Sequence, residues 1–240
     1  SALYQATKTL SFFMLASKSF RAPTLNELYR GFRVGSVVTL ANENLKAEKA
    51  ANFESGLSYS RNKFYFRGNY FFTEIAQPVA NVTLIVAPNL ITRQRQNVGK
   101  IRAQGLEFEA ETKIEDFRIS IGYLFTDSRV AEFPANQALA NLFVPQVARQ
   151  QFTFQTSYAK KDWSLALQGR ASSAQFDDDL NTLRLEPYFQ LDAFAARRLR
   201  ENLQIFFAAE NVFNSRYSIG RTPVRTVSSP FSFRIGFRWK

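Results

Sequence analysis

The sequence contains no cysteine and no histidine, and it has one methionine and two tryptophans among 240 residues. These absences exclude disulfide scaffolds, thiolate or imidazole metal sites, and every catalytic scheme that depends on a thiol or an imidazole. We expect no catalytic residue, no metal site and no cofactor, and the protein is not predicted to be an enzyme.

Long apolar runs are also missing, although hydrophobic residues make up 45% of the chain. A membrane-spanning helix needs roughly 20 consecutive apolar residues, which no segment approaches. A barrel strand needs only about 10 residues of alternating character, so membrane residence stays open. The start, "SALYQATKTL", has no charged region followed by an apolar core, so no signal peptide is expected. Either the protein is cytoplasmic or the sequence is part of something larger, and the strand pattern favours the second.

The net charge is +11, from 31 Lys and Arg against 20 Asp and Glu. Such a charge invites a nucleic-acid interpretation. The basic residues are dispersed, however, and the longest basic tract is "RRLR" at 197–200. No nucleic-acid partner is therefore expected.

Alternation with a period of two runs along the chain, most strictly in the C-terminal "SSPFSFRIGFRWK". Successive side chains of a β-strand point to opposite faces, so each alternating segment predicts a strand with one apolar and one polar face. Ten segments show it: 7–18, 52–60, 63–73, 105–113, 116–126, 151–159, 162–171, 188–196, 202–213 and 228–240. No convincing helix is found. Before Gly105 the apolar residues occupy odd-numbered positions, and after it they occupy even-numbered positions. This change of parity predicts a bulge at Gly105.

The connections between these strands fall into two classes. Four are tight polar turns, "SRNK", "KIED", "AKKD" and "LREN", whereas the others are predicted to span about 12 to 30 residues. Short turns at one end and long loops at the other are typical of an up-and-down outer-membrane barrel, whose short turns face the periplasm. A soluble β-sandwich is the alternative, but its strands average about 5 to 6 residues and these run to about 9 to 13.

The two faces of the strands predict different surroundings. A charge facing the bilayer midplane costs about 2 to 4 kcal/mol for Arg or Lys, so the apolar row is predicted to face lipid and the polar row a lumen. The predicted lumen residues are Glu54, Arg67, Asn69, Glu107, Glu109, Glu111, Arg118, Gln151, Gln155, Gln168, Arg170, Gln190, Asp192, Gln204 and Glu210. The predicted interfacial aromatic residues are Tyr59, Phe72, Trp163, Tyr188, Tyr217 and Trp239. A sandwich would instead bury the apolar row.

Four motifs in order resemble those of TonB-dependent outer-membrane receptors. They are "SFRAPTLNELY" at 19–29, "NENLKAEKAANFESGL" at 42–57, "QNVGKIRAQGLEFE" at 96–109 and "AENVFNSRYSIG" at 209–220, followed by the aromatic alternating C-terminus. The family barrel has twenty-two strands around an N-terminal plug domain. The resemblance therefore implies that residues 1–240 are the C-terminal portion of such a barrel, with the plug and the N-terminal strands absent.

What the resemblance implies for function is active uptake of a large, scarce solute, such as an iron-siderophore or cobalamin, across the bacterial outer membrane. The implied partners are the TonB complex, reached through the missing plug, the outer-membrane lipid and lipopolysaccharide, and the metal chelate or cobalamin itself. A complete ten-stranded barrel acting as a passive pore, an adhesin or an omptin-like protease is the alternative. Omptin-like proteases use His and Asp at the barrel mouth, and this chain has no His.

The first two long loops combine cationic and aromatic side chains that suit an anionic metal chelate. The candidate ligand-binding residues are Arg21, Tyr29, Arg30 and Arg33, with Phe32 among them, in the first loop, and Arg93 and Arg95 in the second. Contact with lipopolysaccharide phosphates, or simple solvation, is the alternative for these arginines. In a later loop Asp177, Asp178 and Asp179 predict either a Ca²⁺ site or a solvated loop tip. Arg216, Arg221 and Arg225 of the last loop suit anion contact without further specificity.

Overall fold

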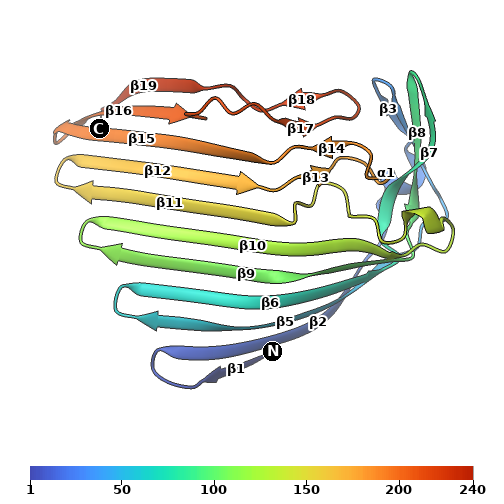
Figure 1. The fold of residues 1–240 in the computed structure, drawn as a ribbon, viewed down its shortest axis with the longest axis horizontal. Helices are drawn as coiled ribbons and strands as arrows, with labels where there is room; N and C mark the ends of the chain where they lie inside the picture. The colour runs from blue at the N-terminus through green and yellow to red at the C-terminus, as the bar shows by residue number, and fades with distance from the viewer. Residues whose placement is uncertain (240) are drawn as a thin grey trace.

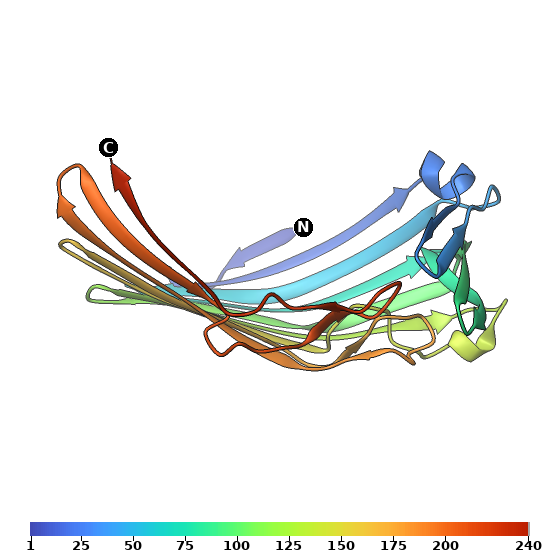
Figure 2. The same cartoon turned by 90° about the horizontal axis from the view of Figure 1, so that it is seen from above.

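A computed structural model describes residues 1–239 and consists mainly of one antiparallel sheet of eleven strands. In spatial order the strands are β1 (Ala2–Gln5), β2 (Leu10–Arg21), β5 (Glu48–Arg61), β6 (Phe64–Ala76), β9 (Lys100–Ile114), β10 (Phe117–Glu132), β11 (Gln150–Lys160), β12 (Trp163–Ser172), β15 (Tyr188–Arg200), β16 (Leu203–Glu210) and β19 (Ser232–Trp239). Every neighbouring pair in this order is antiparallel, and Figure 2 shows that the sheet is a single curved layer. No helix among residues 1–239 is long and apolar enough to cross a membrane.

Smaller elements gather at one end of the sheet (Figure 1). They are α1 (Leu25–Tyr29), β3 (Phe32–Val34), β4 (Val37–Leu40), β7 (Val79–Ala87), β8 (Leu90–Asn97), the 3-10 helix η1 (Gln137–Leu139), β13 (Gln175–Phe176), β14 (Arg184–Leu185), β17 (Ser218–Gly220) and β18 (Thr226–Val227). Strands β3, β4, β8 and β7 form a separate four-stranded sheet. The long loops therefore fold into structures of their own beyond the wall.

The opposite end of the sheet carries the four predicted tight turns. Each joins neighbouring strands through two residues, and three of the turns place Asn62, Glu115 and Lys161 at positive φ. A hairpin of two residues commonly requires this left-handed backbone because it matches the twist of the flanking strands. The predicted separation of short turns from long loops is confirmed.

Strand pairing places the predicted apolar residues on one face. Phe117 lies opposite Tyr158, and Ile121 lies opposite Phe154, so the apolar rows of neighbouring strands run together across the sheet. Side chains on this face remain open to the surroundings: Phe117 is 46% exposed and Phe237 is 73% exposed. A sandwich core would bury them, so the exposure fits a lipid-facing wall and excludes the sandwich alternative.

The opposite face carries the predicted lumen residues. Glu107, Glu109 and Glu111 lie on it together, opposite alternate residues of β6 and β10. Polar contacts link neighbouring strands on this face, as where Arg170 Nη2 donates to Gln190 Oε1 at 2.9 Å. The alternation of the sequence thus predicted the sidedness of the wall.

Two details of the predicted wall are wrong. The sheet has eleven strands in place of ten, because β1 pairs with the first part of β2. Four residues of "ALYQ" are too few to show alternation, which is why the sequence did not reveal this strand. The expectation of no helix is also corrected by α1, a five-residue helix whose capping box at Thr24 and Glu27 was visible as Thr-x-x-Glu.

The predicted interfacial position is correct for only some of the aromatic residues. The register of the strands places Tyr59 and Trp163 on the apolar face near the short turns, with Arg197 stacked 5.0 Å from the Trp163 ring. Tyr188 and Tyr217 instead stack on each other with ring centroids 3.9 Å apart, and Tyr217 is buried and donates to Gln190. These two tyrosines fasten the last long loop to the polar face, so assigning them to an interfacial girdle was wrong.

Gly105 carries no bulge, because β9 pairs through this residue with both neighbours without a shift of register. The parity of the apolar residues changes for another reason. On the outward face Leu106 is followed towards the long loops by two polar residues, Gln104 opposite Phe72 and Arg102 opposite Glu74. Ile101 on the inner face packs into the loop layer instead. The strand stays regular while its surroundings change from hydrocarbon to water.

The glycine itself is required by a close approach of neighbouring strands. A Cβ at Gly105 would lie 1.9 Å from the Phe125 carbonyl oxygen and 2.6 Å from the Phe71 ring. We expect Gly105→Ala to destabilise the full-length protein by about 1 to 3 kcal/mol through overpacking. Thermal unfolding in detergent, followed by circular dichroism, measures the shift. Gly220→Ala is the control, because its new Cβ would meet nothing nearer than 3.9 Å. Equal midpoints for the two variants would contradict this account.

Candidate functional site at the long-loop end

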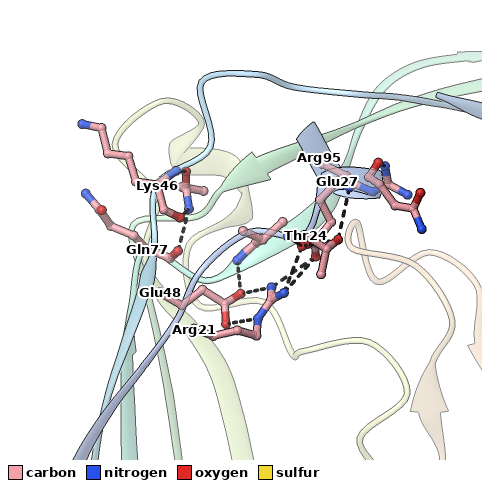
Figure 3. Close-up of polar contacts among 10 residues, drawn as sticks. Arg21, Thr24, Glu27, Lys46, Glu48, Gln77 and Arg95 are labelled. Atoms are coloured by element: carbon pink, nitrogen blue, oxygen red, sulfur yellow. Dashed lines mark hydrogen bonds and ion pairs between the residues drawn. The ribbon is translucent and has the colours of Figure 1, made fainter. Parts of the chain in front are cut away.

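Arg21 is the last residue of β2 and holds the entrance of the first long loop (Figure 3). Its Nε and Nη2 donate to the two carboxylate oxygens of Glu48 at 2.8 and 2.7 Å, and Nη1 donates to Glu27 Oε2 at 2.9 Å. Bidentate pairing of this kind is both strong and directional. The guanidinium therefore ties the end of β2 to the start of β5 and to helix α1.

Helix α1 is fixed by its own capping box as well. Thr24 Oγ1 accepts from the Glu27 backbone N–H at 3.3 Å, and Glu27 Oε2 accepts from the Thr24 backbone N–H at 2.7 Å. The Arg21 guanidinium lowers the pKa of Glu27 to about 2, with the bonds from Thr24 adding to the effect and burial opposing it. Glu27 is therefore ionised throughout the physiological range and serves the helix and the ion pair together.

Arg95 connects the first long loop to the second. Its Nη1 donates to the backbone oxygens of Asn26 and Arg30 at 2.6 and 2.9 Å, which satisfies carbonyls at the end of α1 (Figure 3). The same guanidinium lies 5.2 Å from the centre of the Phe32 ring. Strand β8, which carries Arg95, also pairs in parallel with β4 of the first loop. The two loops thus form one body, and Arg95 is part of its framework.

Three of the candidate ligand-binding residues lie on the open surface of this body. Tyr29 is 63% exposed at the end of α1, and Arg30 and Arg33, one and four residues further along the chain, are also exposed. Arg33 makes one bond within its own hairpin, from Nε to the Gly35 carbonyl at 2.9 Å. Most of its donors and those of the Arg30 guanidinium remain directed to solvent. This cluster of Tyr29, Arg30 and Arg33 is called the loop-one cluster below.

Arg93 lies apart from the loop-one cluster, in the wall of a cavity of about 290 Å³ between the second and later loops. Its Nε is buried, and within residues 1–239 it has no hydrogen-bond partner. The cavity is lined by Ala80, Asn81, Val82, Arg93, Val98, Ile101, Val130, Leu139, Phe143, Val144, Pro145, Gln146, Asp177, Asp178 and Asp179. The buried guanidinium with a free donor favours a neutral hydrogen-bond-accepting guest, because the three aspartates in the same lining disfavour an anion.

Neither prediction for the aspartates is correct, because all three carboxylates are bonded inside the loop layer. Asp179 accepts from the Thr83 N–H and hydroxyl at 2.8 and 2.6 Å, and Asp178 accepts from Thr182 and Leu183 in its own loop. Among residues 1–239 no cluster of carboxylates suits a metal ion. Because N–H and hydroxyl groups occupy these oxygens, Asp177 and Asp179 join separate loops and Asp178 holds its own loop, and none of them is set out for Ca²⁺.

Asp177 is the most connected of the three and is only 6% exposed. Its Oδ2 accepts from the Arg221 N–H, the Thr222 N–H and the Thr222 hydroxyl at 2.8 to 2.9 Å, and its Oδ1 accepts from Gln146 Nε2 at 2.9 Å. Burial alone would raise the pKa of Asp177, but these hydrogen bonds outweigh it and hold the pKa below its ordinary value. This carboxylate therefore joins three loops that are far apart in the sequence.

The arginines of the last long loop serve different purposes. Arg221 donates from Nη1 to the Arg184 carbonyl at 3.2 Å, and Arg225 donates from Nε to the Ser218 hydroxyl at 3.0 Å. Arg216 is exposed. Sequence reasoning grouped these three with possible anion contacts and overlooked the framework role of Glu48 and Asp177. The capping box was a visible signal for the Glu27 arrangement, whereas nothing local marked Asp177.

Comparison with known proteins agrees with this architecture. A family model described as TonB dependent receptor-like, beta-barrel, matches residues 1–212. The chain is 24% identical over 214 residues to the vitamin B12 transporter BtuB of Photobacterium profundum, covering 89% of this chain and 33% of that protein. It is 31% identical over 121 residues to the probable hemoglobin and hemoglobin-haptoglobin-binding protein 4 of Haemophilus influenzae, covering 45% of this chain and 11% of the relative.

Among solved structures, the siderophore receptor PiuA of Acinetobacter baumannii superposes with a TM-score of 0.78 at 18% identity. The match covers 99% of this chain and 34% of PiuA. The chain thus spans about a third of the length of this receptor and of the vitamin B12 transporter. The family model covers most of the chain, and the wall has the predicted lipid-facing row, which places it in the bacterial outer membrane. The chain belongs to the β-barrel family of TonB-dependent receptors.

Proposed function

We propose that these 240 residues form the C-terminal portion of the barrel of a TonB-dependent active transporter. The remaining strands and a plug domain would be supplied by a longer protein, because the chain spans about a third of two of its relatives. A barrel of twenty-two strands is part of this proposal. Energy would come from the TonB complex of the inner membrane, acting through the plug.

The proposed cargo is a large, scarce solute such as an iron-siderophore or cobalamin. The names of the relatives and of the similar structure refer to vitamin B12, hemoglobin and a siderophore, which differ from one another in size and in chemistry. The surface of this chain narrows the choice towards solutes with anionic or hydrogen-bond-accepting groups. Cationic and aromatic side chains together can bind such a solute by charge-assisted hydrogen bonds and stacking.

The observation that carries the proposal is the loop-one cluster on a rigid support. Tyr29, Arg30 and Arg33 are exposed, whereas Arg21 and Arg95 beneath them are engaged with Glu27, Glu48 and backbone carbonyls. Sites built on rigid elements bind with less loss of conformational entropy. We infer that Arg21 and Arg95 position the cluster, and that the cluster and Arg93 contact the solute.

The test is solute uptake by a strain that lacks the full-length gene, complemented with the wild-type gene. Radiolabelled cobalamin, haem and a panel of ferric siderophores are supplied one at a time. Restoration of energy-dependent uptake for one class, abolished by a TonB deletion, supports the proposal. If the complemented strain takes up every solute no faster than the deletion strain does, the proposal is overturned.

For the solute that is taken up, Tyr29→Ala/Arg33→Ala is expected to weaken binding about tenfold, because stacking and a charge-assisted hydrogen bond are lost together. Binding to whole cells at low temperature measures the dissociation constant without transport. Lys63→Gln, in a short turn at the opposite end of the wall, is the matched loss of charge and should bind normally. Equal affinity of the double variant and wild type would remove the loop-one cluster from the site.

A further inference from the structure

The cavity that contains Arg93 lies inside the loop layer, in the loops that connect strands from the middle of the wall. Its lining comes from the connections between β6 and β9, between β10 and β11, and between β12 and β15. Most of the lining is buried or half-buried, whereas Asn81 and Gln146 are exposed and mark its opening to water. At about 290 Å³ the cavity is far larger than one buried water needs and approaches the size of pockets for small organic molecules.

Hydrogen bonds between the loops hold the walls of the cavity in place. Asn181 Nδ2 donates to the Phe143 carbonyl at 2.9 Å, and Asn181 Oδ1 accepts from the Phe143 N–H at 2.8 Å. Asp179 accepts from the Thr83 N–H at 2.8 Å and so joins the same loop to β7. A guest therefore enters a preformed site and does not have to order the loops around it.

One wall presents a hydrogen-bond donor that the chain leaves unused. Arg93 Nε is buried, and the part of the chain that the structure describes supplies no acceptor for it. A buried donor without an acceptor costs free energy, which a guest with an acceptor recovers. Elsewhere in the lining, Val82, Val98 and Leu139 are buried apolar side chains. A fitting guest thus combines a hydrogen-bond acceptor with an apolar body.

The charges around the cavity disfavour ionic guests of either sign. Asp177, Asp178 and Asp179 place three carboxylates in the lining against the single guanidinium of Arg93, so an anion meets net repulsion. A cation is repelled by Arg93, and the carboxylate oxygens already accept hydrogen bonds from the loops. An uncharged carbonyl group meets neither obstacle, and its oxygen can accept from Arg93 Nε.

The backbone of Arg93 lies within reach of the loop-one cluster. Phe32 of β3 pairs with Thr39 of β4, which pairs with Arg93 of β8, so the three residues form one row across the four-stranded sheet. Two strand spacings of about 4.8 Å each separate the backbones of Phe32 and Arg93. Arg33 of the loop-one cluster follows Phe32 directly. A large solute on the cluster can therefore extend one of its arms to the cavity.

We propose that the cavity is a specificity pocket for an uncharged, carbonyl-bearing arm of the transported solute, such as an amide or an ester on an apolar group. The carbonyl oxygen accepts from Arg93 Nε, and the apolar group lies against Val82, Val98 and Leu139. The pocket rests on the function proposed above, because the loop-one cluster holds the anionic part of the same solute. Solutes whose arms are all anionic are disfavoured here by the three aspartates.

The test uses the full-length receptor purified in detergent, with para-fluorobenzamide and para-fluorobenzoate as probes and fluorine NMR titration as the measurement. The two probes have nearly the same shape, but only the benzamide is uncharged. Wild type is expected to bind the benzamide about tenfold more tightly than the benzoate. Arg93→Met is expected to weaken binding of the benzamide about tenfold, because the donor is lost. Arg61→Met, which removes an exposed arginine at the short-turn end of β5, is the matched control and should bind as wild type does.

Ala80→Leu tests the cavity without changing Arg93. The larger side chain fills part of the space, so binding of para-fluorobenzamide should fall in this variant as well. Circular dichroism verifies that each variant is folded, and if one of the two does not fold, the other gives the answer. Equal binding of the benzamide to wild type and to the folded variants would overturn the proposal, and so would tighter binding of the benzoate than of the benzamide to wild type.

A competition measurement separates this pocket from the proposed transport. In whole cells at low temperature, para-fluorobenzamide should compete with the transported solute for the wild-type receptor and about tenfold less effectively for Arg93→Met. Binding of the benzamide without competition would overturn the assignment to an arm of the solute. If no solute is taken up while the benzamide binds in an Arg93-dependent manner, the transport proposal fails and the cavity is supported as a binding site. Normal uptake without such binding overturns the pocket alone.

Discussion

Asp177→Ala is expected to detach the late loops from one another and to lower the stability of the loop layer by about 3 kcal/mol. The substitution leaves the Arg221 and Thr222 N–H groups without their acceptor in a buried place and removes the partner of Gln146. Hydrogen exchange of the full-length protein, read by mass spectrometry, should show faster exchange in peptides covering 137–148 and 217–227. The eleven-stranded wall should keep its slow exchange, because no wall strand depends on this carboxylate.

Asp177→Asn separates the loss of charge from the loss of the acceptor. An amide oxygen can still accept from the Arg221 and Thr222 N–H groups, and the amide nitrogen can donate to Gln146 after that side chain turns over. The asparagine variant should therefore retain most of the protection. If alanine and asparagine accelerate exchange equally, the geometry of these hydrogen bonds does not stabilise the layer.

The Asp177 contact also predicts a dependence on pH. Since hydrogen bonding keeps the folded-state pKa below the ordinary value of 3.8, the stabilisation is complete above about pH 4 and is lost as pH falls through the lowered value. The alanine variant should lack this part of the acid dependence. Exchange measured over a series of acidic buffers, corrected for intrinsic rates, tests it.

Arg21→Gln is expected to loosen α1 and the start of the second long loop. Without the guanidinium, Glu27 and Glu48 face each other uncompensated, and Glu48 also holds the Val79 N–H at 2.6 Å. The side chain of Arg21 is 44% exposed, so solvent screening reduces the loss to about 1 to 2 kcal/mol. Denaturant unfolding of the full-length protein, with exchange of the α1 peptide, measures it.

Arg216→Gln is the matched control, because Arg216 is an exposed arginine of the long-loop end that forms no ion pair among residues 1–239. A double-mutant cycle with Glu48→Gln isolates the interaction between Arg21 and Glu48.

The folded-state pKa of Glu27 is about 2 against an ordinary 4.5, so the stabilisation that Glu27 contributes is complete above pH 4.5 and is lost as pH falls towards 2. If the stability of the Arg21→Gln variant falls with acid in the same way as that of wild type, Arg21 is not the cause of the lowered pKa of Glu27.

The wall of this protein was largely predictable because a strand with different solvents on its two faces must alternate. The apolar row of residues 116–126 and the two-residue turns each follow from local rules, and both were confirmed. Where the character of the outward row changed within one strand, the rule misled, because the outward residues of β9 become polar at Gln104 and Arg102 without a bulge at Gly105.

The candidate site was only partly predictable, because its geometry depends on contacts between distant loops. The sequence indicated that arginines of the first two loops matter, but not that Arg21 and Arg95 are engaged while Arg33 stays open. Asp177 appeared to be a loop tip since its acceptor role needs residues 31 to 45 positions away. Parallel pairing of β4 with β8 likewise has no local signature.

The length of β9 and β10 determines how the receptor meets the cell surface. They contain 15 and 16 residues, whereas about 10 are enough to cross the bilayer. The remaining residues, at about 3.3 Å each, raise a collar on the order of 15 Å above the lipid. The loops that follow these strands are therefore carried clear of the lipid surface and fold entirely in water.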